Sequence, residues 1–344
     1  MKNYLLNERN RGTVPCWFMR QAGRYHSHYQ NLKKSHSFMN LCKNPELACE
    51  VTLGPIEDFK FDAAILFSDL LFPLENLGMG LSYESGPPTL AFHLAERINL
   101  KKIKQQFAAN EFYQFQQNAL KLLKKKLPEE KTLLGFVGAP FTLYTYAMEG
   151  GHHGSLIEAK KGFYDGTFKD FFPLLKSEIL ASMIAQAKGG ADVICLFDTA
   201  AGELNLRDFE TYLMPATIQV IDEFKISFPL IPICYYSKYT NLDYLRQIPK
   251  KKIDIIGMDW RVDLRKVLKE FGEHFFVQGN LDPAWLHLPK ETLQTNLKQW
   301  KIDMQAVKEY WPKWIAGLGH GVLQKTPEAN VKLTVDFIHC DLIS

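Results

Sequence analysis

Eight short apolar segments recur along the chain, and each is followed by a turn and a longer amphipathic stretch. They are rich in Ile, Val, Leu and Phe and nearly continuous, which is typical of strands buried on both faces of a parallel sheet. The segments are residues 15–19, 62–68, 132–138, 191–197, 230–237, 253–259, 274–280 and 314–319. Eight strand–helix units predict an α/β protein that folds as a single (β/α)8 TIM barrel. A doubly wound open sheet is the alternative.

The stretches between these segments predict the outer helices. Residues 45–59 start with Pro45 directly after Asn44, which is a suitable N-cap residue. Further helices are expected over residues 98–127, 170–188, 206–228, 262–271, 292–310 and 327–340, with a short one over 241–247. No Pro/Ser-rich linker or low-complexity segment divides the chain, so we expect residues 1–344 to form one domain.

Composition limits the partners and the compartment. The 344 residues are 46% hydrophobic and carry a net charge of +3, which is ordinary for a globular protein and too small to require a nucleic-acid partner. The charged start predicts no signal peptide, and the longest uncharged run, 133–148, contains Gly138 and Pro140 and is shorter than the about 20 residues of a membrane span. The six cysteines form no C-x-x-C pair. We therefore expect a reduced, cytoplasmic protein without a membrane partner.

In a parallel barrel, the residues that end the strands face one pocket. Arg20, Gln21 and Arg24 follow the first segment, and the two arginines flank Gly23. The polar residues at the other strand ends are Ser68, Asp69, Thr142, Tyr144, Tyr146, Asp198, Thr199, Ser237, Asp259, Asn280, Asp282 and His320. Guanidinium groups match carboxylates bidentately, so the arginine pair predicts an anion site. The alternative is a solvated loop between strand and helix.

Asp69 and His320 are the other prominent candidates. Asp69 ends one apolar run and precedes another, so its carboxylate is expected to be partly buried and in need of a partner. Its alternative role is an N-cap for the following segment. His320 lies between Gly319 and Gly321, which leave room for a ligand or make a tight turn in which the histidine binds the backbone.

Cofactor motifs are absent from the sequence. There is no H-E-x-x-H, no paired C-x-x-C and no P-loop, and Val322 breaks the dinucleotide pattern G-x-G-x-x-G. We therefore expect no metal and no nucleotide cofactor. The glycine-rich segment 150–154, which contains His152 and His153, predicts a mobile loop that can serve as a lid.

Several longer motifs occur in a fixed order. They are P-C-W-F-M-R-Q-A-G-R-Y (15–25), D-A-A-I-L-F-S-D (62–69), G-F-V-G-A-P-F-T-L-Y-T-Y-A-M-E-G (135–150), F-D-T-A-A-G (197–202), G-M-D-W (257–260), Q-G-N-L-D-P (278–283) and L-G-H-G-V with T-P-E-A-N-V (318–331). In this order they resemble the uroporphyrinogen decarboxylase family nearly from end to end. The departures from the family pattern are His26-Ser27-His28, Phe141, Ala200 and Lys238-Tyr239-Thr240.

The resemblance implies a (β/α)8 barrel, usually a homodimer, that uses no metal or organic cofactor. The substrate would be uroporphyrinogen III, whose four acetate side chains lose carbon dioxide in turn to give coproporphyrinogen III. The family's binding residues correspond to Arg20, Gln21, Ala22, Gly23, Arg24, Asp69, Tyr146, Thr199 and His320. Asp69 would stabilise a cationic pyrrole ring. Arg20 and Arg24 would hold substrate carboxylates, and one of them is a candidate for proton delivery.

Two other functions compete with this interpretation. Zinc-dependent corrinoid or cobalamin methyltransferases share the barrel superfamily and bind zinc through His and Cys. Here Cys234 lacks the preceding histidine ligand, and position 320 is His instead of Cys. The third possibility is a non-catalytic tetrapyrrole-binding protein that retains the pocket.

Overall fold

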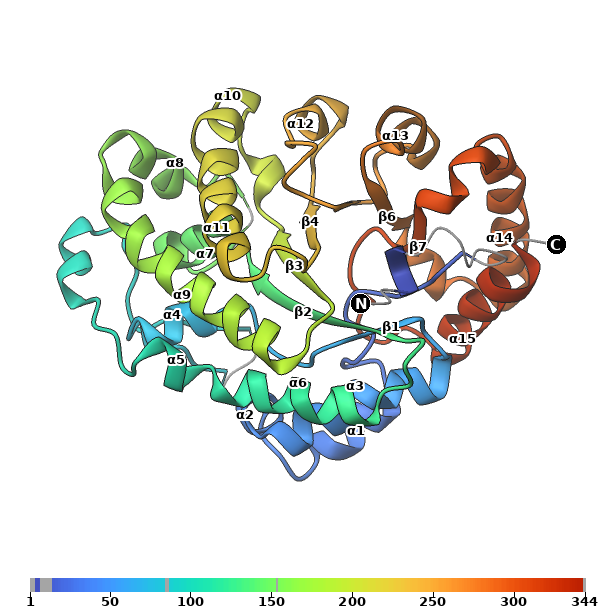
Figure 1. The fold of residues 1–344 in the computed structure, drawn as a ribbon, viewed down its shortest axis with the longest axis horizontal. Helices are drawn as coiled ribbons and strands as arrows, with labels where there is room; N and C mark the ends of the chain where they lie inside the picture. Colours follow the sequence, from blue (N-terminus) through green and yellow to red (C-terminus); the bar gives the residue numbers. More distant parts are fainter. Residues whose placement is uncertain (1–3, 7–13, 84–86, 153, 343–344) are drawn as a thin grey trace.

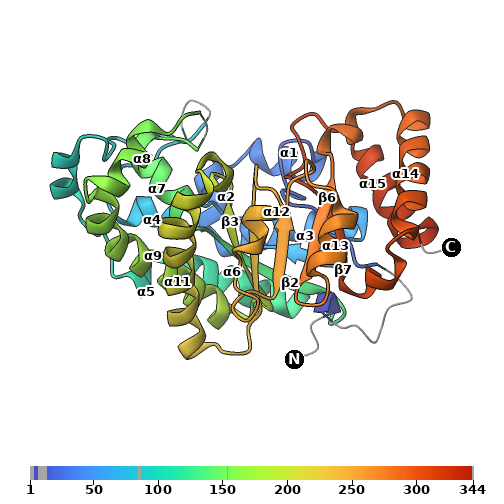
Figure 2. The ribbon, with the colours of Figure 1, turned by 90° about the horizontal axis from the view of Figure 1, so that it is seen from above.

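Seven parallel strands form one curled sheet in sequence order, with helices packed around its outside (Figures 1 and 2). The structure is a computed structural model that describes residues 4–6, 14–83, 87–152 and 154–342. The strands are β1 (Ala63–Ile65), β2 (Thr132–Gly138), β3 (Val193–Asp198), β4 (Ile233–Ser237), β5 (Ile255–Met258), β6 (Phe276–Leu281) and β7 (Trp314–Leu318). Every neighbouring pair is parallel, so seven of the eight predicted strands are confirmed.

The predicted first strand, 15–19, is reduced to a single parallel bridge between Cys16 and Ala316. The Ala316 N–H donates to the Pro15 carbonyl at 2.8 Å, and the Asp62 N–H donates to the Cys16 carbonyl at 2.9 Å. The segment therefore hydrogen-bonds to β7 on one side and to the start of β1 on the other. It stays short because the chain turns at Arg20, whose φ of 59° is left-handed.

Burial on both sides explains why these segments become strands. Every residue of β1 to β5 and of β7 is buried. One apolar cluster draws its side chains from several strands: Ala63, Ile65, Leu134, Phe136, Val193, Cys195, Phe197, Cys234, Tyr236, Ile255 and Ile315. A second, larger cluster joins the sheet to the surrounding helices. All six cysteines are free; Cys340 is exposed and the other five are buried, as expected of small apolar side chains.

The helices surround the sheet. They are α1 (Ser27–Lys33), α2 (Phe38–Lys43), α3 (Pro45–Phe59), α4 (Phe72–Asn76), α5 (Ala109–Phe112), α6 (Gln114–Lys126), α7 (Pro140–Glu149), α8 (Ile157–Tyr164), α9 (Thr167–Gly189), α10 (Leu206–Asp208), α11 (Met214–Ser227), α12 (Leu242–Arg246), α13 (Leu264–Phe271), α14 (Lys290–Gln305) and α15 (Glu328–Asp336). Helix α3 has the predicted bounds, and Asn44 Oδ1 accepts from the Leu47 N–H at 3.0 Å as its N-cap. No helix of the described part of the chain is long and apolar enough to cross a membrane.

Some predicted helices were wrong in extent. The stretch 98–127 is a 3-10 turn (Arg97–Lys102) followed by α5 and α6, because backbone and side-chain atoms of Asn76 bind the N–H groups of Gln106 and Phe107 and hold that link extended. The stretch 206–228 contains a π turn (Phe209–Leu213) just before Pro215, which has no N–H to donate. The last two predicted helices also end early, in a 3-10 turn (Lys308–Lys313) and a π turn (Phe337–Asp341).

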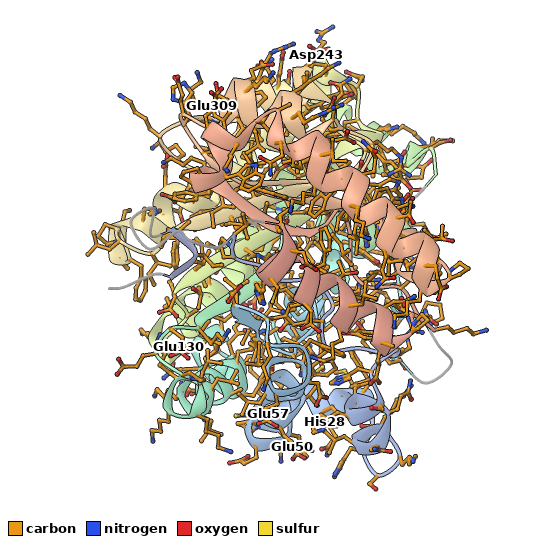
Figure 3. The ribbon with its side chains drawn as sticks, turned by 90° about the vertical axis from the view of Figure 1, so that its right-hand side faces the viewer. His28, Glu50, Glu57, Glu130, Asp243 and Glu309 are labelled. Atoms are coloured by element: carbon orange, nitrogen blue, oxygen red, sulfur yellow. The ribbon has the colours of Figure 1, made fainter. Side chains whose placement is uncertain are left out.

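The departure at residues 26–28 is structural and joins α1 to α3. His26 is completely buried, and its Nε2 lies 2.7 Å from Asp58 Oδ2. His28 packs on Gly54, where a Cβ would lie 2.5 Å from the ring. Figure 3 shows His28 and Glu50 close together at the lower edge of that view, with the C-terminal helices crossing above them.

Candidate active site

The candidate residues lie on loops that follow strand ends, plus one helix. Arg20 and Asp69 follow the 15–17 segment and β1, Thr199 follows β3, and His320 follows β7. Tyr146 lies on α7, a helix that was not among those expected from the sequence. Eight of the ten residues of α7 are buried, so the helix lacks the amphipathic pattern by which helices are recognised.

The Arg20 side chain lies against the loop that follows β7. It exposes area to solvent, yet burial among protein atoms lowers the pKa of its guanidinium, and the charge of Arg24 lowers it further. Gly321 fixes its position, because a Cβ there would lie 2.4 Å from Arg20 Cδ.

The rest of the arginine loop supports this placement. Gln21 is completely buried and its Nε2 donates to the Ala63 carbonyl at 3.0 Å, which ties the loop to β1. Ala22 and Gly23 are half-buried in the turn. Arg24 is exposed, and the Gln324 amide oxygen, in the orientation that satisfies both groups, accepts from Arg24 Nη2 at 2.6 Å. The binding roles predicted for these four residues remain predictions.

The Asp69 side chain is held by a hydrogen bond to the backbone two residues further on. Its Oδ1 accepts from the Leu71 N–H at 2.8 Å, a turn that precedes α4 without making Asp69 the N-cap residue, which is Leu71. Burial raises the pKa of Asp69, whereas the Tyr83 hydroxyl, the Leu71 N–H and the charge of Arg20 favour its ionised form. Arg20 and Asp69 influence each other through this charge but form no ion pair.

Tyr146 completes this side of the site. Its hydroxyl lies 2.8 Å from Nδ1 of His152, in the glycine-rich segment predicted as a lid; His153 lies outside the described residues. Burial, with the nearby charge of Asp69, raises the pKa of Tyr146 to about 12, so its hydroxyl remains protonated at neutral pH. Tyr146 is therefore an uncharged donor beside two opposite charges.

Thr199 contributes an unsatisfied hydroxyl. The side chain is 6% exposed, and its Oγ1 has no hydrogen-bond partner in the structure. The preceding carboxyl group, Asp198, is fully buried and accepts from the hydroxyls of Thr142 at 2.8 Å and Tyr235 at 3.0 Å. Burial raises the pKa of Asp198 to about 6. Thr142 lies on α7, one helical turn before Tyr146. Its hydrogen bond to Asp198 therefore places the Thr199 loop beside α7.

His320 is a neutral donor. Its Nδ1 accepts from the Gly321 N–H at 2.7 Å, so the neutral ring carries its proton on Nε2. Burial, followed by the charges of Arg20, Lys238, His152 and Arg261, lowers the pKa of His320 to about 3. The flanking glycines make room for protein atoms: a Cβ at Gly319 would lie 2.3 Å from the Trp260 backbone nitrogen.

Tyr83, Gln324 and Arg261 are neighbours of these residues that were not expected from the sequence. Tyr83 and Gln324 lie in irregular segments without a periodic pattern, so nothing in their sequence context signals them. Arg261 comes two residues after Asp259, which was recognised as a strand-end residue. The rule that strand-end residues share one edge of the sheet could therefore have found Arg261 as well. No three His, Cys, Asp or Glu side chains gather as a metal site in the residues that the structure describes.

A curled parallel sheet with charged residues converging at the carboxyl ends of its strands defines the class of α/β enzymes that bind substrates at that edge. A sequence model of uroporphyrinogen decarboxylase (URO-D) matches residues 4–340. The chain belongs to the uroporphyrinogen decarboxylase family.

Curated relatives agree with this assignment. The uroporphyrinogen decarboxylase of Carboxydothermus hydrogenoformans is 34% identical over 95% of this chain and 92% of its own length. That of Vesicomyosocius okutanii is 37% identical over 95% of this chain and 93% of its own length.

Solved structures show the same fold at low sequence identity. A methyltransferase from Methanosarcina mazei superposes with a TM-score of 0.74 at 16% identity and covers 97% of both chains. A B12-independent methionine synthase from Shewanella sp. W3-18-1 gives a TM-score of 0.54 at 12% identity, covering 95% of this chain and 94% of its own. These likenesses concern the fold alone.

Proposed function

We propose that this protein is a carboxy-lyase that converts uroporphyrinogen III to coproporphyrinogen III by removing four molecules of carbon dioxide. One observation carries the proposal: Arg20 and Asp69 lie near enough for their opposite charges to act on each other, yet they do not pair with each other. Two unpaired opposite charges suit a ligand that offers both carboxylates and N–H groups. A porphyrinogen has carboxylate side chains around a ring of pyrrole N–H groups.

The reaction needs a place for electrons. When the bond between an acetate methylene and its carboxylate breaks, carbon dioxide leaves and the bonding electrons move into the pyrrole ring. A proton on the ring makes it an iminium-like cation that accepts them, and a proton taken up at the methylene then gives the methyl group as the ring proton leaves. Asp69, directed at the pyrrole N–H groups, would stabilise that cation by preorganised electrostatics.

The remaining groups would hold the substrate. Each charge-assisted hydrogen bond from Arg20 or Arg24 to a carboxylate contributes about 1.5–3 kcal/mol. Tyr146, Thr199 and the Nε2–H of His320 would donate to further carboxylate oxygens without adding charge. One of the two arginines is also the candidate for delivering the proton.

The hydrogen bonds of residues 15–17 to β7 and β1 support a closed barrel in which this segment is the eighth strand. The family resemblance supports a homodimer and a cytoplasmic location.

Product analysis tests the proposal. Purified protein is incubated anaerobically with uroporphyrinogen III, and the oxidised porphyrins are separated by their number of carboxyl groups. We expect hepta-, hexa- and pentacarboxylate porphyrins, followed by coproporphyrin. Tight binding without any of these products would favour a non-catalytic tetrapyrrole-binding protein. Stoichiometric zinc in the pure protein together with an unchanged octacarboxylate would favour a methyltransferase.

A further inference from the structure

Two cations and two aromatic rings stack at the ends of β4 and β5. The Lys238 ammonium lies 4.4 Å from the centroid of the Tyr239 ring, and the Arg261 guanidinium lies 4.3 Å from the same ring. Arg261 also lies 4.2 Å from the Trp260 ring. We call Lys238, Tyr239, Trp260 and Arg261 the cation stack. Such contacts orient cationic groups and keep them on the protein surface.

A buried carboxylate anchors the stack. Asp259 is 1% exposed and accepts from the Tyr239 N–H at 2.7 Å, the Arg261 N–H at 2.9 Å and Arg261 Nη1 at 2.9 Å. These bonds use one nitrogen of the guanidinium, while the Arg261 side chain remains 44% exposed. The other guanidinium nitrogens can therefore donate to a ligand.

The Lys238 side chain, unlike that of Arg261, is not bound to Asp259. Its ammonium makes no ion pair with any described residue, because Asp259 pairs with Arg261 instead. Its backbone is nevertheless rigid, since its N–H donates to the Asp198 carbonyl at 3.3 Å and its carbonyl accepts from the Gly202 N–H at 3.0 Å. A Cβ at Gly202 would lie 2.3 Å from the Tyr239 carbonyl carbon, so this loop is also closely packed.

The cation stack lies beside the loop that carries His320, since a Cβ at Gly319 would lie 2.3 Å from the Trp260 backbone nitrogen. The charges of Lys238 and Arg261 both lower the pKa of His320, as does the charge of Arg20, which belongs to a different loop. The His320 ring in turn packs edge-on against Tyr236, a residue of β4 that lies two residues before Lys238. Uncompensated positive charge therefore lies on the β4–β5 side of His320, separate from the arginine loop.

We propose that Lys238 and Arg261 form a second carboxylate subsite, which holds a side-chain carboxylate of the substrate that is not the one reacting. The proposal rests on the proposed function, because it assumes a polycarboxylate ligand. Its role is to bind and position the substrate, and the reacting acetate lies elsewhere, between Arg20 and Asp69. The subsite therefore acts on substrate affinity and has little effect on the chemical step.

Charge-removing and charge-keeping variants test this subsite. Lys238→Met keeps the apolar stem over Tyr239 and removes the charge, whereas Lys238→Arg keeps it. We expect Lys238→Met to raise KM for uroporphyrinogen III about tenfold with kcat within about twofold. The decline of kcat/KM with added salt should also become shallower, because one screened contact is lost. Lys238→Arg should restore both values.

The matched control is Arg246→Gln, a surface arginine on α12 that pairs with Glu270 and Asp243. It should leave KM and the salt dependence unchanged. Wild-type KM and salt dependence in Lys238→Met would overturn the subsite, and so would a loss of kcat alone. If the wild type forms no decarboxylated product, the proposed function fails instead. The affinity for coproporphyrin, measured by quenching of tryptophan fluorescence, then tests the subsite by itself. Equal affinity in wild type and Lys238→Met would overturn the subsite.

Discussion

The side chain of Arg20 lies directly on the backbone of Gly321, so that a Cβ at position 321 would stand 2.4 Å from Cδ and 2.6 Å from Cγ of Arg20. Arg20 itself has a left-handed backbone, with φ of 59°. The loop after β7 therefore sets the position of a guanidinium that belongs to the loop after residues 15–17. This contact joins the loop after residues 15–17 to the loop after β7, the last strand of the sheet.

Gly321→Ala should displace Arg20 and lower kcat/KM by about 100-fold, the cost typical of a shift of about 1 Å in a positioned group. The effect depends on the Arg20 stem. In an Arg20→Ala background, where Cγ and Cδ are absent, Gly321→Ala should cause no further loss. Steady-state kinetics of the double-mutant cycle measure this coupling. Additive losses would show that the contact does not position Arg20.

Thr199→Val should separate stability from binding. It removes a buried hydroxyl that has no partner, so the free energy of unfolding should stay equal or rise by about 1 kcal/mol, while KM rises. Thr217→Val is the matched control, because the Thr217 hydroxyl is equally buried but donates to the Leu213 carbonyl at 3.0 Å. That variant should lose stability and keep its kinetics. Urea unfolding and initial rates give both quantities, and a destabilised Thr199→Val with unchanged KM would contradict the binding role.

His320 should remain neutral through the physiological pH range. Burial and the surrounding cations lower its pKa to about 3, and the Gly321 N–H occupies Nδ1. Nitrogen NMR of protein with labelled histidine should show one ring that is protonated on Nε2 and does not titrate between about pH 5 and 8. His320→Gln identifies that signal by its loss. Titration of the assigned ring near pH 6.5 would contradict the description of His320 as an uncharged donor.

Asp62 should stabilise the fold in a pH-dependent way. Burial raises its pKa, but the hydrogen bond and charge of His339, the charge of Lys131 and the Cys16 N–H together lower it below the ordinary 3.8. The carboxylate thus stabilises the folded state fully above pH 3.8, and the contribution is lost as the pH falls below that value toward the folded pKa. Asp62→Asn should lower the free energy of unfolding at pH 7 by about 2 kcal/mol.

The deficit of Asp62→Asn should narrow as the pH falls below 3.8 in urea unfolding followed by circular dichroism. Asp336→Asn provides a surface control, since Asp336 is more than half exposed and pairs with Lys332 on the same helix. It should change stability by less than about 1 kcal/mol at any pH. A deficit in Asp62→Asn that is constant with pH would show that its charge is not involved.

The strands and the clearly capped helices were predictable because their signals are local. Seven apolar segments became strands near their predicted bounds, and Asn44 with Pro45 marked the start of α3. Helix α7 was missed because burial on nearly all sides removes amphipathicity, and 98–127 was overextended because Asn76, far away in the chain, binds the link at residues 106–107. Long-range contacts of this kind leave no periodic trace.

The candidate site was likewise predictable only in part from the sequence. The rule that strand ends share one edge predicted that Arg20, Asp69 and His320 lie near one another, and in the structure the charge of Arg20 acts on both Asp69 and His320. It could not predict the Gly321 contact that places Arg20, since a glycine beside a histidine equally suits a turn or a ligand. Tyr83 was also beyond it, because its approach to Asp69 depends on an irregular segment.

The most direct test of the account is the rate of carbon dioxide release from enzyme-bound uroporphyrinogen III in Asp69→Asn, measured in a single turnover with enzyme in excess. Asparagine keeps an oxygen that can accept from the Leu71 N–H, removes the charge and replaces the second oxygen by an NH2 group. We expect the chemical step to slow by about 100-fold or more, with substrate affinity changed far less, as when one preorganised electrostatic group is removed. Release at the wild-type rate would contradict the central role of the Asp69 carboxylate.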